Sequence, residues 1–453
     1  MRSRNLFFIL FILINFSLFS QQLNTSPFSR YGIGEINTIQ SAHYLGWSNT
    51  SVAFSDPRYI NISNPASYSQ FVKHNPLFDV SLTGKNSIYE SNYNDEFKTS
   101  SGSDFGLNNM FLGLPLTRKW GMVIGIIPMS SVGYEVSSES VVDTSIVTSR
   151  FNGDGSINKL LIGNGFNIIN KGDSTRLSIG FNASYLFGTL NHISSFIHTS
   201  PSSYNSRIHQ RSSISGWNFD GGIQFLKRFK TSSKNRYFLR IGSSISMGPN
   251  LNSNNDLYAY TFLYNFGVQE IPFDTLENVE NKQSEISIPS KMSFGIGFGK
   301  NKNSQRSWDL SLQYSISDWS NFNATTNLAN QTSLPLGPSS TMAIGYRITP
   351  NLDWSNNNKS IFTKSSYSFG YHYTESAILL ENIGLINNGI NFGVSIPLLS
   401  SRSLSMMNLS CEVGRLGNIG INKIEENYIK FAIGFTMAPD TRYDRWFRKR
   451  KYD

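Results

Sequence analysis

The chain has few charged residues, a single cysteine and, beyond its first twenty residues, no long apolar run. Charged side chains make up 15% of the 453 residues, against about 25% in an ordinary soluble protein. No later apolar run approaches the roughly 18 residues that span a bilayer, which disfavours a bundle of membrane helices. Because Cys411 is the only cysteine, an intramolecular disulfide and a multi-cysteine metal site are excluded.

Aromatic residues, by contrast, are abundant. They make up 13% of the chain, with 33 Phe and 21 Tyr, yet the mean hydropathy is only −0.26. The polarity therefore comes from Ser, Asn, Gln, Thr and Gly. Disorder is disfavoured because the aromatic side chains supply ample surface to bury. This composition favours an all-β protein that turns apolar side chains outward into lipid.

The first twenty residues predict a signal peptide. Arg2 and Arg4 precede an apolar stretch from Leu6 to Phe19, and Ser20 can stand before the cleavage site. A retained membrane anchor is the alternative, but a stretch of about 14 residues is short for one. We therefore expect an exported chain located in the outer membrane, with the mature protein beginning at Gln21.

Apolar and polar residues alternate repeatedly along the chain. In 217–225, for example, Trp217, Phe219, Ile223 and Phe225 share one face, as β-strand geometry requires. A soluble sandwich also alternates, but large apolar faces over nine to eleven residues match a tilted membrane strand. Fourteen such strands are predicted, near 76–84, 106–116, 120–128, 157–169, 176–188, 215–227, 236–248, 290–300, 306–317, 340–348, 364–374, 388–398, 404–414 and 427–437.

The connections between these strands mostly alternate between short and long. Short ones include 117–119 and 170–175; long ones include 85–105, 129–156, 189–214, 249–289 and 318–339. Short periplasmic turns and long outer loops are typical of outer-membrane barrels, as is an even strand number. The sequence therefore predicts a 14-stranded antiparallel transmembrane β-barrel over residues 73–437.

Two segments flank the predicted barrel. Residues 21–72 show little periodicity and are predicted to form a hatch or plug in the lumen, with a periplasmic extension as the alternative. Residues 438–453 form a basic aromatic periplasmic tail. The tail is expected to anchor at lipid headgroups or to dock on a periplasmic partner, with no nucleic acid available there. Its candidate docking residues are Arg445, Trp446, Arg448 and Lys449.

Catalytic and metal-binding patterns are weak. Of the six histidines only His372 lies well inside a predicted strand, where a polar lumen residue is a better interpretation than part of a hydrolase triad. The run of Asn residues from Asn250 to Asn255 lacks the carboxylates of a calcium loop. Cys411 is expected only to pack against lipid. We predict no enzymatic step, no metal and no cofactor.

The stretch from Gly46 to Ala66 resembles the N-terminal segment of FadL-type (FadL/TodX) outer-membrane barrels. Gly46, Ala53 and Asp56 occupy positions of that family's glycine-led start, and Asn64, Pro65 and Ala66 match its Asn-Pro-Ala motif. The beginning SPFSRYG and the end WFRKRKYD look like a Bacteroidetes-type member. The resemblance implies a fourteen-strand barrel with an N-terminal hatch that passes hydrophobic small molecules inward. In that family loops capture the ligand, the hatch shifts, and the ligand leaves through a gap in the wall.

Two functions remain open. The first is passive uptake of a hydrophobic small molecule, gated by the hatch motif Asn64, Pro65 and Ala66, with Phe262, Tyr264 and Phe266 as candidate ligand contacts. These aromatic residues also fit a strand that continues above the membrane. The second is a non-transporting barrel subunit of an outer-membrane protein secretion or assembly complex, because some relatives do not transport and architecture does not fix activity.

Overall fold

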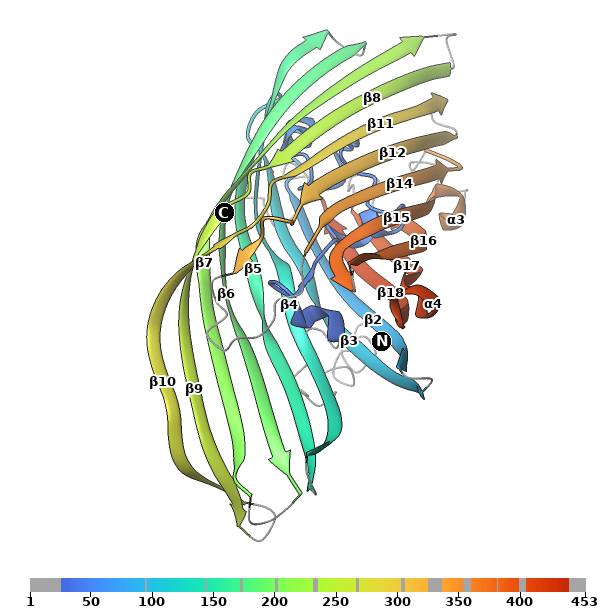
Figure 1. Ribbon diagram of the computed structural model, residues 1–453. Helices are drawn as coiled ribbons and strands as arrows, with labels where there is room; N and C mark the ends of the chain where they lie inside the picture. Colours follow the sequence, from blue (N-terminus) through green and yellow to red (C-terminus); the bar gives the residue numbers. More distant parts are fainter. Residues whose placement is uncertain are drawn as a thin grey trace, which may run out of the picture.

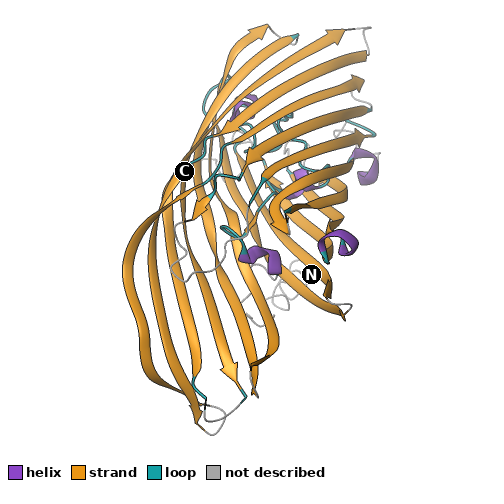
Figure 2. Cartoon of the chain, in the orientation of Figure 1, coloured by secondary structure: helices purple, strands orange, loops and turns teal. Residues whose placement is uncertain are grey.

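The computed structural model describes residues 26–93, 96–142, 145–171, 174–199, 203–230, 235–265, 269–302, 306–324, 336–352, 360–380, 382–398 and 405–439. Most of the described chain is β-strand (Figures 1 and 2). The predicted signal peptide, Phe266 and the tail residues Arg445, Trp446, Arg448 and Lys449 lie outside the described residues. Within the described part, no helix is both long and apolar enough to cross a membrane.

Fourteen antiparallel strands form a closed barrel, as the alternation predicts. Neighbouring strands pair in chain order, and β18 pairs with β2 to close the circle. Each of the fourteen predicted spans falls on one of these strands. They are β2 Leu77–Tyr93, β3 Glu96–Pro115, β4 Trp120–Val142, β5 Ser145–Lys171, β6 Thr175–His198, β7 Asn205–Lys230, β8 Asn235–Ser246, β11 Lys291–Lys302, β12 Ser307–Asp318, β14 Pro338–Thr349, β15 Ser366–Leu380, β16 Ile383–Pro397, β17 Met406–Gly417 and β18 Ile424–Met437.

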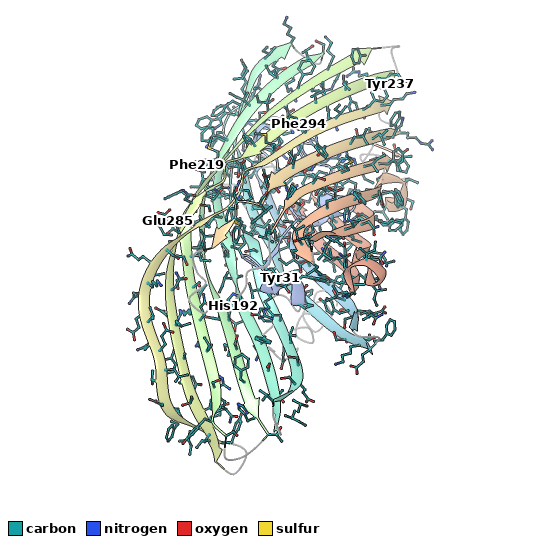
Figure 3. The ribbon with its side chains drawn as sticks, in the orientation of Figure 1. Tyr31, His192, Phe219, Tyr237, Glu285 and Phe294 are labelled. Atoms are coloured by element: carbon teal, nitrogen blue, oxygen red, sulfur yellow. The ribbon has the colours of Figure 1, made fainter. Side chains whose placement is uncertain are left out.

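An apolar band covers the outer face of the barrel. Phe219 is 49% exposed and Phe294 is 52% exposed, and both belong to this band (Figure 3). Their sequence neighbours point inward, since successive side chains of a strand lie on opposite faces. A large exposed apolar surface is stable only against another apolar phase, and lipid supplies it for an outer-membrane barrel.

The strands differ greatly in length, and the barrel is therefore lopsided (Figure 1). β4, β5, β6 and β7 have 23 to 27 residues, whereas β8, β11, β12 and β14 have 12. The long strands continue as a curved sheet beyond one end of the barrel. Because outer-membrane barrels keep their short turns in the periplasm, we assign this extension, termed the outer wall, to the outside.

The predicted long loops are largely strands of this outer wall. Residues 249–289 form a hairpin of β9 Asn250–Asn265 and β10 Gln269–Ser287. β9 pairs with the N-terminal half of β7, from Asn205 to Ser215. Residues 85–105, 129–156 and 189–214 likewise lie mostly in strands. For Tyr258 to Tyr264 the alternative of a strand that continues above the membrane is confirmed. Elsewhere the loop expectation was wrong because polar side chains on both faces weaken the alternation above the membrane, while backbone pairing continues.

The N-terminal residues 26–76 lie inside the barrel and are called here the inner segment. They contain the short elements η1 Pro27–Arg30, β1 Glu35–Ile36, α2 Ala42–Leu45 and η2 Pro65–Gln70. Its side chains bond to strands on opposite sides of the wall: Tyr68 to Asn182 of β6, and Ser48 to Asn391 of β16. The remaining short elements are β13 Asn323–Ala324, α3 Ile361–Lys364 and α4 Ile419–Asn422.

Candidate functional site

The wall of the barrel has a seam between β3 and β4. These strands pair only between Met110–Pro115 and Gly121–Ile126, and they separate above that stretch. The pairing ends just before Pro128, which has no N–H to give to a ladder. The adjoining β4–β5 ladder also shifts register between Pro128 and Ser130. A proline and a bulge together therefore direct β4 away from β3.

The inner segment enters this seam and joins its two sides. The short strand β1 pairs with Ser130 and Ser131 of β4. Directly after it, the Asn37 backbone N–H donates to Met129 O at 2.9 Å. The Asn37 side-chain amide donates to Asn108 Oδ1 of β3 at 3.0 Å and to Pro128 O of β4 at 3.1 Å. One asparagine thus bridges both strands at the point where they part.

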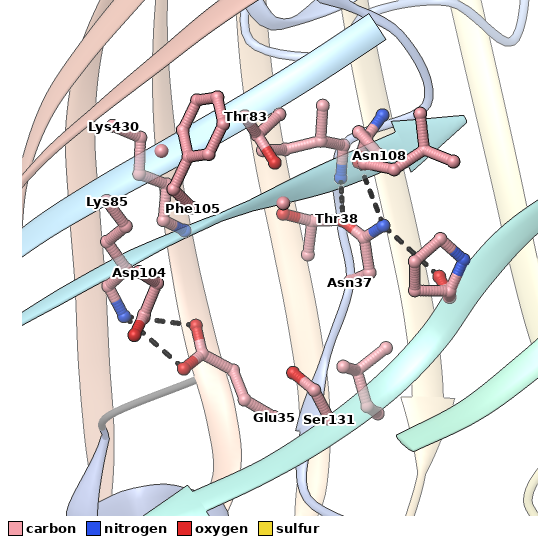
Figure 4. A pocket seen from close by; sticks show the side chains of 16 residues that line it. Glu35, Asn37, Thr38, Thr83, Lys85, Asp104, Phe105, Asn108, Ser131 and Lys430 are labelled. Atoms are coloured by element: carbon pink, nitrogen blue, oxygen red, sulfur yellow. Dashed lines mark hydrogen bonds and ion pairs between the residues drawn. The ribbon is translucent and has the colours of Figure 1, made fainter. Parts of the chain in front are cut away.

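A small charged cavity lies beside this bridge (Figure 4). Its volume is about 110 Å³, and residues of the inner segment, β2, β3, β4 and β18 line it. Lys85 Nζ lies 3.2 Å from Glu35 Oε1 and 2.6 Å from Glu426 Oε1. An apolar cavity that binds benzene has about 150 Å³ and no charged lining. The seam cavity suits ion pairs and water better than a hydrophobic ligand.

Deeper in the lumen, ion pairs fix the inner segment to the wall. Asp56 pairs with Arg58 of the same segment at 2.5 Å and with Arg347 of β14 at 3.6 Å. Arg347 also pairs with Asp309 of β12 at 2.6 Å, and Asp309 with Arg240 of β8 at 3.3 Å. These five residues are called the charge lock. Removing one partner of such a buried pair is costly because it leaves an uncompensated charge.

The environment of the charge lock keeps Asp56 ionised. Burial alone would raise the pKa of Asp56, but the Arg58 guanidinium and, secondarily, Arg347 hold that pKa well below its usual range. The ring centroid of Phe54 lies 4.6 Å from the Arg347 guanidinium carbon and 5.1 Å from the Arg240 guanidinium carbon. Cation–π contact and ion pairing therefore act on the same part of the inner segment.

The Asn-Pro-Ala motif lies at a second attachment point. The Asn64 amide donates to Val52 O at 2.8 Å and, across to the wall, to Ile223 O of β7 at 3.1 Å and Ser243 O of β8 at 3.2 Å. Asn64 Oδ1 accepts from the Ala66 N–H and caps η2, which Pro65 begins. Each residue of the motif thus has a structural task; a gating role for the motif stays a prediction.

Glycines on the lumen face of the barrel strands let the inner segment approach the strand backbone closely. A Cβ at Gly165 would lie 2.5 Å from Pro65 O, and one at Gly370 would lie 2.6 Å from the Trp47 carbonyl carbon. Side chains at these positions would displace the segment. The small inward residues that the sequence associates with a wet lumen therefore also serve as a packing surface. Further wall glycines of this kind are Gly121, Gly180, Gly242, Gly345 and Gly393, the last of which faces Gly46 of the inner segment.

Two of the candidate ligand contacts, Phe262 and Tyr264, are described and lie in the outer wall. Phe262 of β9 is fully buried, 4.9 Å from the Arg207 guanidinium carbon and in ring contact with Tyr264. Tyr264 is 37% exposed and donates to Glu270 at 3.4 Å. By register with β7 both residues share the face that carries Trp217 and Phe219. Their role in ligand capture stays a prediction.

The sequence also singles out residues for catalysis or metal binding, among them His372. His372 Nδ1 lies 3.4 Å from Asn391 Oδ1 of β16, so among the described residues its hydrogen-bond neighbour is an amide of the lumen. Among the described residues, no group of three or more His, Cys, Asp or Glu side chains could hold a metal ion. Sequence reasoning missed Asn37, Glu35 and the charge lock. Only Pro128, inside a predicted strand, signalled the end of the β3–β4 pairing.

Comparison with known proteins gives a family and a fold. The BamG family model matches residues 2–453. Among solved structures, a Pseudomonas aeruginosa FadL homologue has a TM-score of 0.52 at 9% identity, covering 90% of this chain and 99% of that one. The P. putida toluene transporter TodX has a TM-score of 0.52 at 13% identity, covering 88% and 98%. The Ralstonia pickettii toluene transporter TbuX has a TM-score of 0.50 at 13% identity, also covering 88% and 98%.

No curated protein matches the chain. The identities to the solved barrels are too low to transfer an activity, but the shared architecture covers almost the whole of each. The resemblance read from residues 46–66 is confirmed at the level of the fold, whereas the Bacteroidetes-type origin stays a prediction. The chain belongs to the BamG family and is an outer-membrane β-barrel of the FadL-like fold.

Proposed function

We propose that this barrel is a non-transporting subunit of an outer-membrane protein assembly complex. The observation that carries the proposal is the filled interior: the charge lock and the Asn64 bonds tie the inner segment to β7, β8, β12 and β14. Shifting such a segment to admit a ligand would break several buried ion pairs and hydrogen bonds at once. That makes the interior a poor passage and a good rigid support.

The outer surface supports the same role. The apolar band gives the barrel its place in outer-membrane lipid, and the outer wall presents long strands beyond it. A transporter of small molecules has no evident need of such a one-sided wall, whereas a docking subunit does. The family name, BamG, points in the same direction. We propose that the protein partner is another outer-membrane or periplasmic protein, and that no enzymatic step is involved.

Depleting the protein from its own cell tests this proposal. We expect the folded fraction of other outer-membrane barrels, measured as heat-modifiable migration on gels, to fall before growth stops. Uptake of a radiolabelled aromatic hydrocarbon by the same cells should not change. Normal levels of folded barrels together with lost uptake would refute the subunit function.

Passive uptake of a hydrophobic small molecule is the second candidate. The seam favours it, because a gap in the wall is where the FadL-like resemblance expects a ligand to leave. In this function Asn64, Pro65 and Ala66 act as the hatch, and Phe262, Tyr264 and Phe266 as ligand contacts. Replacing all three aromatic residues by Ser should then reduce uptake, while an unchanged uptake rate would remove that assignment.

The basic aromatic tail offers a separate test of docking. We propose that Arg445, Trp446, Arg448 and Lys449 contact lipid headgroups or the protein partner. Deleting residues 440–453 should release the partner from a barrel that still migrates as folded. If the truncated barrel fails to assemble, the tail is only an anchor.

A further inference from the structure

We infer that the free edge of β3 above the seam, Glu96–Ser103, accepts an added β-strand from another outer-membrane barrel. The inference rests on the proposed function and names the surface through which it acts. Along this stretch β3 pairs with β2 on one side only. On its other side the described residues provide no strand partner, since the β3–β4 ladder begins at Met110. A row of backbone donors and acceptors is thus left available for pairing.

The opposite edge of the outer wall provides a contrast. β10 is also paired mainly on one side, with β9, and only Ile286 and Ser287 pair with β13 on the other. β10 contains Pro272 and three register shifts. It also carries Glu270, Asp274, Glu277, Glu280 and Glu285. Proline, bulges and charges are the devices by which proteins protect an edge strand from further pairing.

The β3 edge has neither a proline nor a bulge, and its charges are limited to Glu96, Lys98 and Asp104. Between Glu96 and Leu107 its ladder with β2 runs without a register shift. The stretch has no proline and consists largely of Ser, Thr and Gly. Its first six side chains are all exposed. Edges without such interruptions are rare in stable proteins because they invite association. A β3 edge without proline or bulge, beside a β10 edge that has both, therefore indicates a pairing surface.

The chemistry of the two faces of β3 defines the partner strand. Phe97, Phe105 and Leu107 lie on one face and are 72%, 41% and 46% exposed. Glu96, Lys98 and Asp104 lie on the other face. A strand that continues this sheet must therefore be apolar on the face beside Phe105 and Leu107 and can be polar on both faces farther out, as membrane strands that extend into the outer wall of this barrel are. The same seam already holds one added strand, because β1 pairs with β4 on its opposite side.

Site-specific photocrosslinking tests the inference in the complete complex. A benzophenone amino acid is placed in turn at Thr99, Ser101 and Ser103 of β3, and at Thr275 and Asn278 of β10 as matched controls. We expect the β3 positions alone to crosslink to one barrel protein. The crosslinked residue in that protein should shift by about two positions for each step of two along β3, which is the signature of strand pairing.

Two adjacent prolines add a second, independent measurement. Neighbouring N–H groups of a strand point to opposite sides, so Ser100→Pro and Ser101→Pro remove one N–H from the free edge and one from the β2 ladder. The proline variant that removes the N–H of the free edge should keep its heat-modifiable migration yet bind the partner about tenfold more weakly.

The outcomes separate this inference from the proposed function. If a stoichiometric partner is recovered but the β3 crosslinks are absent or follow no register, the strand-addition inference is overturned and the subunit function stands. If no partner accompanies the barrel at all, both are overturned.

Discussion

At the scale of single residues, the charge lock decides whether the inner segment can move. Asp56 is the residue of the inner segment that forms an ion pair with Arg347 of the barrel wall. Asp56→Asn leaves Arg58 and part of Arg347 uncompensated in the lumen. We expect the free energy of unfolding to fall by about 3 kcal/mol, measured by urea unfolding in detergent micelles. Asp318→Asn, at an exposed carboxylate of β12, is the matched control and should leave the free energy of unfolding essentially unchanged. Equal effects of both variants would argue against the lock.

His192 gives the molecule a pH dependence above the apolar band. Burial, and then Arg30, lower the pKa of His192 to about 4, and its Nδ1 lies 2.8 Å from the Tyr134 hydroxyl. Between about pH 6.5 and pH 4 the unfolded chain therefore binds a proton that the folded chain does not. The contribution of neutral His192 to the free energy of unfolding is fully present above pH 6.5. As the pH falls this contribution decreases, by about 2 kcal/mol at pH 5.

The measurement is urea unfolding at pH 7.5 and at pH 5. His192→Gln cannot take up that proton, so its loss between the two pH values should be smaller than in the wild type. The same loss in both proteins would show that His192 does not titrate as described.

At the scale of elements, the close fit between the inner segment and the wall depends on glycine. A Cβ at Gly180 of β6 would lie within 2.5 Å of the Ala66 nitrogen, whereas at Gly297 of β11 the nearest atom would be 3.6 Å away. Gly180→Ala should cost about 1–3 kcal/mol through overpacking, and Gly297→Ala much less. Urea unfolding of the two variants compares them directly. A tolerated Gly180→Ala would show that η2 lies less tightly on the wall.

Elements of the barrel could be predicted from the sequence, but their extent could not. The fourteen membrane strands carry large apolar side chains on one face only, and this signal survives without tertiary information. Most of the outer wall lacks this signal, so β10 was expected as a loop, whereas the alternating aromatic residues of β9 already fitted a strand that continues above the membrane. The seam and the charge lock depend on contacts between residues far apart in sequence, such as Asn37 with Asn108 and Asp56 with Arg347. No local pattern encodes such contacts.

At the scale of the whole molecule, the occupied lumen and the one-sided outer wall are the two features on which the proposed support function rests. The fold is shared with hydrocarbon transporters, but the described lumen is occupied by residues that pair with the wall. The same architecture can therefore serve transport in one chain and attachment in another. In this chain the difference would lie in how firmly the inner segment is held and in which edge of the wall is left unprotected.

Native mass spectrometry of the barrel, extracted in mild detergent from its own membrane, tests the central claim most directly. The account predicts a complex with a stoichiometric protein companion and no bound small molecule. A lone barrel that retains an apolar small molecule would contradict it and would establish uptake as the function.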